Sequence, residues 1–233
     1  MPHQTDMPQY VIDRIMAKRG KLEVFDHFDP AKTALVVIDM QNFFVAEVET
    51  GRSIVPNINR LAAEMRARGG VVAWVLMTVA DAEGAPSKWP IYHDYFFTAE
   101  KMAAHRNSLS EGAEGHKLYP KLEVQDGDII ARKSRFSAFI QGACDLHETL
   151  QARGIENLIV CGMATNMCCE SSARDAMMIG YRCVMVSDAN AARFDEDHLA
   201  GLTSFWQSFG DVRTTDDVIE RLLAAPGDAR ATA

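Results

Sequence analysis

The residues NLIVCGMATNMCCESSARDAMMIGYRCVMV, at positions 157–186, decide the fold class of this chain. Two short apolar runs within them, 157–161 and 182–186, have the length and composition of buried strands. The segment between these runs, 168–179, has the apolar spacing of a helix and is followed by Gly180, the residue type that most often ends one. A strand, a helix and a second strand in this order predict a βαβ unit with parallel strands.

The same alternation of apolar runs and amphipathic segments begins at Thr33 and continues through most of the chain. Near-continuous apolar strands suit a parallel sheet that is covered on both faces. We therefore predict a three-layer α/β/α, doubly wound fold with a mostly parallel six-stranded sheet. The predicted strands are 34–38, 71–76, 128–131, 157–161, 182–186 and 211–214, and the predicted helices are 54–68, 142–153, 168–179, 196–207 and 216–224.

Two segments fall outside this pattern. Residues 1–30 are polar and irregular, and we predict an N-terminal arm that packs on a neighbouring subunit, ahead of a single domain over 31–233. Residues 79–125 are only partly periodic and rich in aromatic side chains. Inserts of this length inside a compact domain are usually functional, so we expect this one to form a wall or lid of the ligand pocket.

The composition narrows the class of partner. With 233 residues and a formal net charge of −8, the chain has the size of one domain and lacks the basic stripe of a nucleic-acid binder. The first residues lack the signal-peptide pattern, and no apolar run approaches the roughly 18 residues of a membrane span. The odd number of cysteines, five, argues against a disulfide framework. We expect a cytoplasmic protein that binds a small molecule, and neither nucleic acid nor a membrane.

Polar residues at predicted strand ends are the first candidates for chemistry, because ligands of open α/β sheets bind there. Asp39 ends ALVVID, Lys133 follows IIAR, and Cys168 lies in the turn GMATNMC. If Thr165 or Asn166 caps the following helix, the Cys168 sulfur faces its N–H groups, which lowers the pKa of a thiol. A lysine stabilises a thiolate and an aspartate can carry a proton to a leaving amine, so this set suits acyl transfer from nitrogen.

Each of these residues also has a purely structural interpretation. A cysteine at a helix start is often a small packed residue, an aspartate after a strand often forms a turn, and a strand-end lysine is often solvated. Their joint placement at three strand ends favours the chemical interpretation. We assign the methionines, among them Met163, Met167, Met177 and Met178, to core packing.

Three segments resemble the signature blocks of the isochorismatase-like cysteine hydrolases. They are ALVVIDMQNFF (34–44), ARKSRFSAF (131–139) and GMATNMCCESSARDAMMIGY (162–181), and the similarity in order and spacing runs from about Thr33 to Leu222. This family includes nicotinamidases, N-carbamoylsarcosine amidohydrolases, ureidoacrylate amidohydrolases and isochorismatases. The second block looks most like that of the ureidoacrylate and carbamoylsarcosine enzymes.

The resemblance implies a role for each matching residue. Cys168 is then the nucleophile, Asp39 the general acid and base, and Lys133 the cation that lowers the pKa of both and orients them. The resemblance also implies a cis peptide bond between Met163 and Ala164. The N–H groups of Ala164 and Cys168 are then expected to form an oxyanion hole.

We predict no metal and no other cofactor. Nicotinamidases carry an Asp-x-His metal motif after the second strand, whereas this chain reads TVADAEGAPSKWPIYHDYF (78–96), with His93 alone. We interpret His93 and His116 as surface or loop residues, since no second and third ligand accompany them. Cys169 stands where the family usually has an apolar residue, and we assign it to packing.

Predicted substrate contacts come from the turn after the first strand, from the insert and from the second block. Arg135 is predicted to bind a carboxylate or carbonyl of the substrate with its fork of donors. A helix-start arginine that faces solvent or a neighbouring subunit is the alternative for this residue. The other predicted contacts are Gln41, Asn42, Phe44, Trp89 and Tyr92, with Phe96 beside them.

The expected function is cysteine-dependent hydrolysis of a C–N bond in a small linear amide or ureide, through a thioester, with release of ammonia or carbamate. Isochorismatases proper do not cleave their vinyl ether with a cysteine, so Cys168 favours C–N cleavage. Two alternatives remain: a vinyl-ether hydrolase in which Cys168 is incidental, and a non-catalytic binding protein on the same fold. A homo-oligomer, dimer or tetramer, is expected, and the sequence identifies neither substrate nor pathway.

Overall fold

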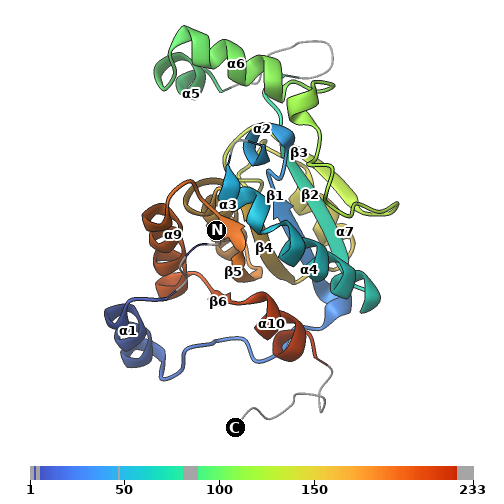
Figure 1. Ribbon diagram of the computed structural model, residues 1–233. Coiled ribbons are helices and arrows are strands. Elements are labelled where there is room, and N and C mark those ends of the chain that lie inside the picture. The colour runs from blue at the N-terminus through green and yellow to red at the C-terminus, as the bar shows by residue number, and fades with distance from the viewer. Residues whose placement is uncertain (1–2, 4–5, 47, 81–88, 225–233) are drawn as a thin grey trace.

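The computed structural model describes residues 3, 6–46, 48–80 and 89–224, and its centre is a six-stranded sheet (Figure 1). All neighbouring strands are parallel, in the order β3-β2-β1-β4-β5-β6. The order changes direction between β1 and β4, which makes the sheet doubly wound, as predicted. The strands are β1 (Thr33–Ile38), β2 (Val71–Met77), β3 (Ile129–Lys133), β4 (Asn157–Met163), β5 (Arg182–Ala191) and β6 (Asp211–Arg213).

Helices cover both faces of the sheet and complete the three predicted layers. Alternate side chains of β1 point to opposite faces, so Leu35 and Val37 join the core on one side and Val36 joins the core on the other. In the described part of the chain, no helix is both long and apolar enough to cross a bilayer. The first face carries α4 (Val55–Ala67), α10 (Thr215–Asp217) and η4 (Val218–Leu222), and the second carries α7 (Leu146–Ala152), α8 (Glu170–Met178) and α9 (Asp195–Ser208).

Four strands, β2, β3, β4 and β5, run further at their carboxyl ends than the sequence predicts, and the extensions of β5 and β3 carry polar residues. β5 continues past its predicted end at Val186 to Ala191. The polar residue Asn190 stays inside this extension because its side-chain amide donates to the carbonyl oxygens of Val160 (2.9 Å) and Val186 (2.8 Å), where the register between β4 and β5 shifts. β3 includes Lys133 as its last residue. Both extensions bring polar residues to the carboxyl edge of the sheet.

The N-terminal arm is not irregular throughout, contrary to the prediction, because α1 (Gln9–Arg19) forms within it. Val11 and Ile15, one turn apart, are buried against Trp206 of α9, and the two helices lie side by side (Figure 1). Other apolar residues of α1, such as Tyr10 and Met16, are exposed, so the apolar residues do not mark a single face and the sequence does not reveal this element. The arm therefore packs on its own chain.

Two helices of the segment 79–125, α5 (Pro90–Tyr95) and α6 (Ala99–Leu109), lie beyond the carboxyl end of the sheet (Figure 1). The described residues of this segment also form the short turn η2 (Glu114–His116), so the segment is more helical than predicted. Residues 81–88 of this insert lie outside the described residues. The remaining short helices are η1 (Pro30–Lys32), α2 (Asn42–Val45), α3 (Glu49–Ser53) and η3 (Thr165–Cys169).

Gly162 marks the closest approach of β4 to β1. Its φ is 116°, and a Cβ atom there would overlap the backbone oxygen of Ile38. We predict that Gly162→Ala lowers the free energy of unfolding, measured with urea, by about 3 kcal/mol, since neither backbone can move without breaking the ladder. Gly20→Ala is the matched control, because Gly20 has a φ of 73° but nothing within 4 Å of a Cβ. The control should cost about 1 kcal/mol, and equal losses would contradict the explanation.

Candidate active site

Three polar side chains from different strand ends meet inside the molecule. Asp39 follows β1, Lys133 ends β3, and Cys168 lies in η3 directly after β4. Because parallel strands end at the same edge of the sheet, the long side chain of Lys133 reaches past the end of β2 to Asp39. The exposed fractions of Asp39, Lys133 and Cys168 are 1%, 0% and 8%. The structure therefore brings together the three residues that the sequence singled out.

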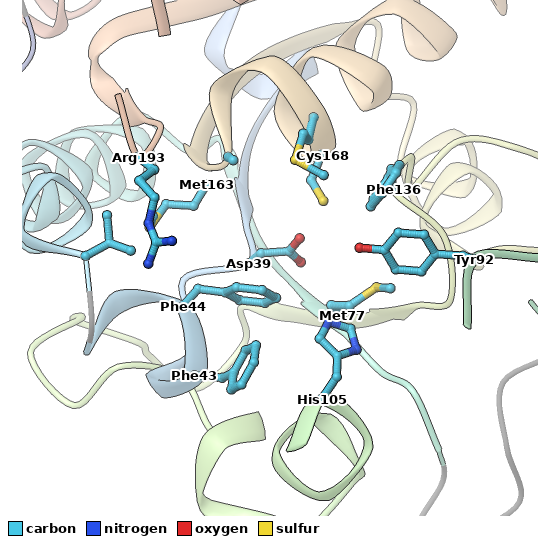
Figure 2. Close-up of a pocket in the computed structure, with 13 residues that line it drawn as sticks. Asp39, Phe43, Phe44, Met77, Tyr92, His105, Phe136, Met163, Cys168 and Arg193 are labelled. Carbon is cyan, nitrogen blue, oxygen red and sulfur yellow. The ribbon is translucent and has the colours of Figure 1, made fainter. Parts of the chain in front are cut away.

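Lys133 is the centre of this cluster. Its Nζ lies 2.8 Å from Oδ2 of Asp39 and 3.4 Å from Sγ of Cys168. A third contact, of 3.1 Å, runs to the carbonyl oxygen of Arg135. These contacts match the three N–H donors of an ammonium group. Figure 2 shows the thiol of Cys168 and the carboxylate of Asp39 pointing toward the same space.

The turn that carries Asp39 has an uncommon backbone conformation. Asp39 has a φ of 53°, the only positive value among the described non-glycine residues, and aspartate tolerates this region better than most. Its N–H donates to the carbonyl of Val75 at 2.9 Å. Gln41 ties the turn to β2, because its side chain accepts from the Met77 N–H (2.8 Å) and donates to the Met77 carbonyl (3.1 Å). Gln41, a predicted substrate contact, is fully buried in this scaffold and does not line the cavity.

The protonation state of Cys168 differs from the prediction. Burial, together with the negative charge of Asp39, raises the pKa of the Cys168 thiol, and Lys133 offsets this only in part. Burial disfavours the charged form of Lys133, but Asp39 and Cys168 outweigh it and raise the pKa of Lys133. The predicted lowering of the thiol pKa is wrong because burial, and after it the charge of Asp39, outweigh the effect of the Lys133 ammonium group. A protonated thiol thus lies beside an ion pair.

The turn that leads into α8 also differs in detail from the prediction. The Met163–Ala164 peptide bond is cis, as the resemblance implies. Neither Thr165 nor Asn166 caps a helix here: Ala164 occupies the cap position of η3 without a side-chain bond. The hydroxyl of Thr165 instead pairs with Nδ1 of His198 at 2.7 Å. The backbone of this turn therefore reaches the cavity through Ala164.

A cavity of about 270 Å³ lies beside the cluster (Figure 2). Its wall is mainly aromatic and sulfur-containing, and two polar side chains, Arg193 and His105, enter it from different sides (Figure 2). A cavity of this size suits a small molecule that is held by few polar contacts. The residues that line it are Asp39, Phe43, Phe44, Val48, Met77, Tyr92, His105, Phe136, Met163, Ala164, Met167, Cys168 and Arg193.

Two of the predicted substrate contacts, Phe44 and Tyr92, line this cavity. Burial raises the pKa of Tyr92 to about 12, so its hydroxyl remains a donor at neutral pH. Asn42 does not line the cavity, and its side-chain amide donates to the carbonyl of Glu114 at 3.0 Å. The turn after β1 thus contributes an aromatic wall residue and a link to the insert.

Trp89 and Arg135 lie behind the wall. The Trp89 ring stacks on Tyr92 with 4.4 Å between centroids, and the guanidinium of Arg135 lies 5.3 Å from the Trp89 centroid. Arg135 also donates to the carbonyl of Ser134 at 2.8 Å. Neither Trp89 nor Arg135 is among the residues that line the cavity. Their contacts support the position of Tyr92.

His105 and Arg193 are cavity residues that the sequence reasoning missed. Arg193 comes two residues after the end of β5, so the strand-end rule would have found it if the strand had been drawn to Ala191. His105 lies on α6 within the insert, where one sequence gives no signal of what faces the cavity.

His93 and His116 are buried, so their assignment to the surface is wrong. The insert folds into packed helices, where His93 contacts the rings of Tyr92 and His105, and Nε2 of His116 lies 2.9 Å from the Thr78 hydroxyl. Burial lowers the pKa of both histidines. Within the described ranges, no group of three or more His, Cys, Asp or Glu side chains could hold a metal ion.

The packing assignments hold in part. Cys169 is fully buried, as predicted. Met163 and Met167 line the cavity, and Met177 and Met178 are exposed near the end of α8. The prediction of core packing is right for Met163, which is buried in the hydrophobic core as well as lining the cavity. It is wrong for Met167, Met177 and Met178, which are exposed, because helical spacing alone does not tell an inner face from an outer one.

A doubly wound α/β domain with a buried cysteine, lysine and aspartate beside a small cavity has the architecture of a hydrolase. The chain matches the Isochorismatase domain over residues 33–217. It is 34% identical over 196 residues to the isochorismatase family protein YwoC of Bacillus subtilis, covering 84% of this chain and 97% of YwoC. It is 32% identical over 205 residues to the ureidoacrylate amidohydrolase RutB of Pseudomonas savastanoi pv. phaseolicola, covering 81% and 82%. The chain belongs to the isochorismatase family of hydrolases.

Solved structures agree with this assignment. A cysteine hydrolase from Pseudomonas syringae pv. phaseolicola superposes with a TM-score of 0.76 at 29% identity, covering 85% of this chain and 95% of that one. An N-carbamoylsarcosine amidase from Thermoplasma acidophilum has a TM-score of 0.64 at 24% identity, covering 79% and 97%, and shares the fold. These structures confirm the predicted fold.

The Asp39–Lys133 ion pair has a measurable effect on stability. Lys133→Met leaves the Asp39 carboxylate buried without a counter-charge, and we predict a loss of about 3 to 5 kcal/mol in the free energy of unfolding. The double variant Asp39→Asn/Lys133→Met removes both charges and keeps a residue that tolerates positive φ, so most of the loss should be recovered. Urea unfolding of the native protein and both variants measures this. Equal losses in the single and double variants would contradict the role of the pair.

Proposed function

We propose that the chain is a cysteine-dependent amidohydrolase that cleaves a C–N bond of a small linear amide or ureide. The observation that carries this proposal is the Cys168 thiol beside the buried Asp39–Lys133 ion pair, with Cys168 and Asp39 both facing the cavity. A thiol next to a carboxylate is a nucleophile with its general base in place. The ureidoacrylate amidohydrolase and the cysteine hydrolase among the similar proteins support this proposal.

In the first half-reaction, Asp39 accepts the thiol proton while the sulfur of Cys168 attacks the carbonyl carbon of the substrate. The electron pair of the carbonyl moves to its oxygen, where the N–H groups of Ala164 and Cys168 stabilise the negative charge. Asp39 then gives the proton to the departing nitrogen, the C–N bond breaks, and ammonia or an amine leaves. The acyl group remains on Cys168 as a thioester, and Lys133 keeps its charge throughout.

In the second half-reaction, Asp39 accepts a proton from water as the water oxygen attacks the thioester carbon. The tetrahedral intermediate collapses, the C–S bond breaks and the sulfur of Cys168 regains the proton from Asp39. The product is a carboxylic acid or a carbamate. Every proton transfer uses a side chain of the cluster, so we propose that the reaction needs no metal ion.

We assign Arg193 to an acidic group of the substrate. Its guanidinium enters the cavity from the loop after β5 (Figure 2) and makes no hydrogen bond or ion pair with another residue in the described part of the chain. A carboxylate is the natural partner of such a group. Ureidoacrylate and N-carbamoyl amino acids carry both a ureido carbonyl and a carboxylate, and we propose this class of substrate.

The activity test is ammonia release from ureidoacrylate, N-carbamoyl amino acids, biuret, maleamate and nicotinamide. Cys168→Ala should lower turnover of the active substrate by about 10³-fold or more, because it removes the nucleophile. Cys169→Ala is the matched control and should retain turnover, and EDTA should have no effect. Turnover that persists in Cys168→Ala would contradict the mechanism, and no ammonia release from any substrate of the panel would favour the vinyl-ether or the binding-protein alternative. Loss of turnover in EDTA would contradict metal independence.

Arg193→Met tests the assignment of the acidic group. The KM for a carboxylate-bearing substrate should rise by about 10- to 100-fold, since a hydrogen-bonded ion pair is lost. The KM for the corresponding neutral amide should change by less than about twofold. Arg193→Lys keeps the charge without the fork and should lie between the two. Equal changes for the acid and the neutral amide would contradict the assignment.

The proposal extends to the cellular location, the domain organisation and the assembly of the enzyme. We propose that it works in the cytoplasm, where its free cysteines stay reduced. We propose further that residues 31–233 form one hydrolase domain behind the arm 1–30, and that the protein assembles as a homo-oligomer. The exposed apolar side chains Ile91, Tyr95 and Phe96 on and beside α5 support an assembly.

A further inference from the structure

The cavity contains two polar side chains to which the proposed function gives no role, the hydroxyl of Tyr92 and the imidazole of His105. His105 lies on α6 in the insert, and its ring points into the cavity near Met77, on the opposite side from Cys168 (Figure 2). Its exposed fraction is 8%. His105 thus combines burial with a direct position on the cavity wall.

The ring of His105 has no hydrogen-bond partner among the described residues. Its Nδ1 is shielded from solvent and unpaired. Its neighbours are aromatic rings, with centroid distances of 5.5 Å to Phe43, 5.1 Å to Phe97 and 6.3 Å to Tyr92. Its Nε2 also makes no hydrogen bond to any residue that the structure describes, and buried polar groups are almost always hydrogen-bonded, so this nitrogen is available to a ligand in the cavity.

The charge and tautomer of this ring restrict what it can bind. Burial, with the neighbouring His93, lowers the pKa of His105 to about 4, so the imidazole is neutral at neutral pH. A neutral imidazole has one N–H donor and one acceptor nitrogen. We place the proton on Nε2, because Nδ1 is enclosed without an acceptor and an N–H group there would stay unpaired. The ring therefore presents a neutral donor.

We propose that His105 is a specificity-determining residue that donates a hydrogen bond from Nε2 to an acceptor oxygen of the substrate, distinct from the carbonyl that Cys168 attacks. Arg193 and His105 then bind different groups of the substrate. A guanidinium favours a carboxylate, and a neutral imidazole donor favours an uncharged carbonyl oxygen. The proposed class thus narrows to acidic amides or ureides that carry an uncharged carbonyl oxygen besides the one that Cys168 attacks. This inference rests on the proposed function in that it takes the cavity as the substrate site.

Binding to Cys168→Ala protein tests the inference without turnover. The probes are acetylurea and ethylurea, which share a ureido group and a two-carbon substituent and differ in one carbonyl oxygen. In this background, His105→Leu should weaken the binding of acetylurea about tenfold and that of ethylurea by less than twofold, as measured by calorimetry. His105→Gln retains a donor and should recover most of the affinity. His93→Leu is the matched control, because His93 is buried beside His105 but does not line the cavity.

A second measurement leaves His105 unchanged. In the ¹⁵N spectrum of histidine-labelled Cys168→Ala protein, His105 should carry its proton on Nε2, and acetylurea should shift this signal while ethylurea should not. A proton on Nδ1, equal responses to the two probes, or no binding of acetylurea would overturn the inference. These results are separate from the activity panel. If no substrate of the panel releases ammonia but acetylurea binds more tightly than ethylurea through His105, only the amidohydrolase proposal is rejected. If the protein turns over a substrate of the panel but His105→Leu affects both probes equally, only the role of His105 is rejected.

Discussion

The buried ion pair between Asp39 and Lys133 is the interaction on which the rest of the site depends. Two charges in the interior are stable only if their distance and their remaining hydrogen bonds are maintained. The structure maintains the distance by fixing both strand ends: Gln41 links the Asp39 turn to β2 by hydrogen bonds, and Lys133 reaches across from β3. The close approach of β4 to β1 at Gly162 sets the position of the next turn. The sheet thus holds the cluster rigidly.

Different parts of the chain supply the groups of the proposed mechanism and the groups that contact the substrate. Strand ends of the sheet supply the three groups that the proposed mechanism uses, and these groups are nearly inaccessible to solvent. The insert and the loop after β5 supply the groups of the cavity wall that can distinguish one substrate from another, among them Tyr92, His105 and Arg193. A fold of this kind can change its substrate by altering the insert while the cluster stays fixed.

Much of this arrangement could be predicted from the sequence, and the failures have physical reasons. The strands, and the positions of Asp39, Lys133 and Cys168 at their carboxyl ends, follow from apolar runs, which are local properties. The raised pKa of the Cys168 thiol could not be predicted, because it depends on enclosure by residues that are distant in the chain. The length of β5 was missed because Asn190 satisfies its amide only after β4 is in place. His105 was missed because the folding of the insert, and not its sequence pattern, brings it to the cavity.

The protonation state of Cys168 at neutral pH tests the central claim most directly, namely that a neutral thiol gives its proton to Asp39 when substrate arrives. Difference infrared spectroscopy between the native protein and Cys168→Ser measures the S–H stretching band of this thiol alone. The account predicts a band at neutral pH that persists until the pH exceeds the ordinary cysteine value of 9.0. Absence of the band at neutral pH would mean that the thiol is already ionised beside Lys133, and would contradict the assignment of Asp39 as its base.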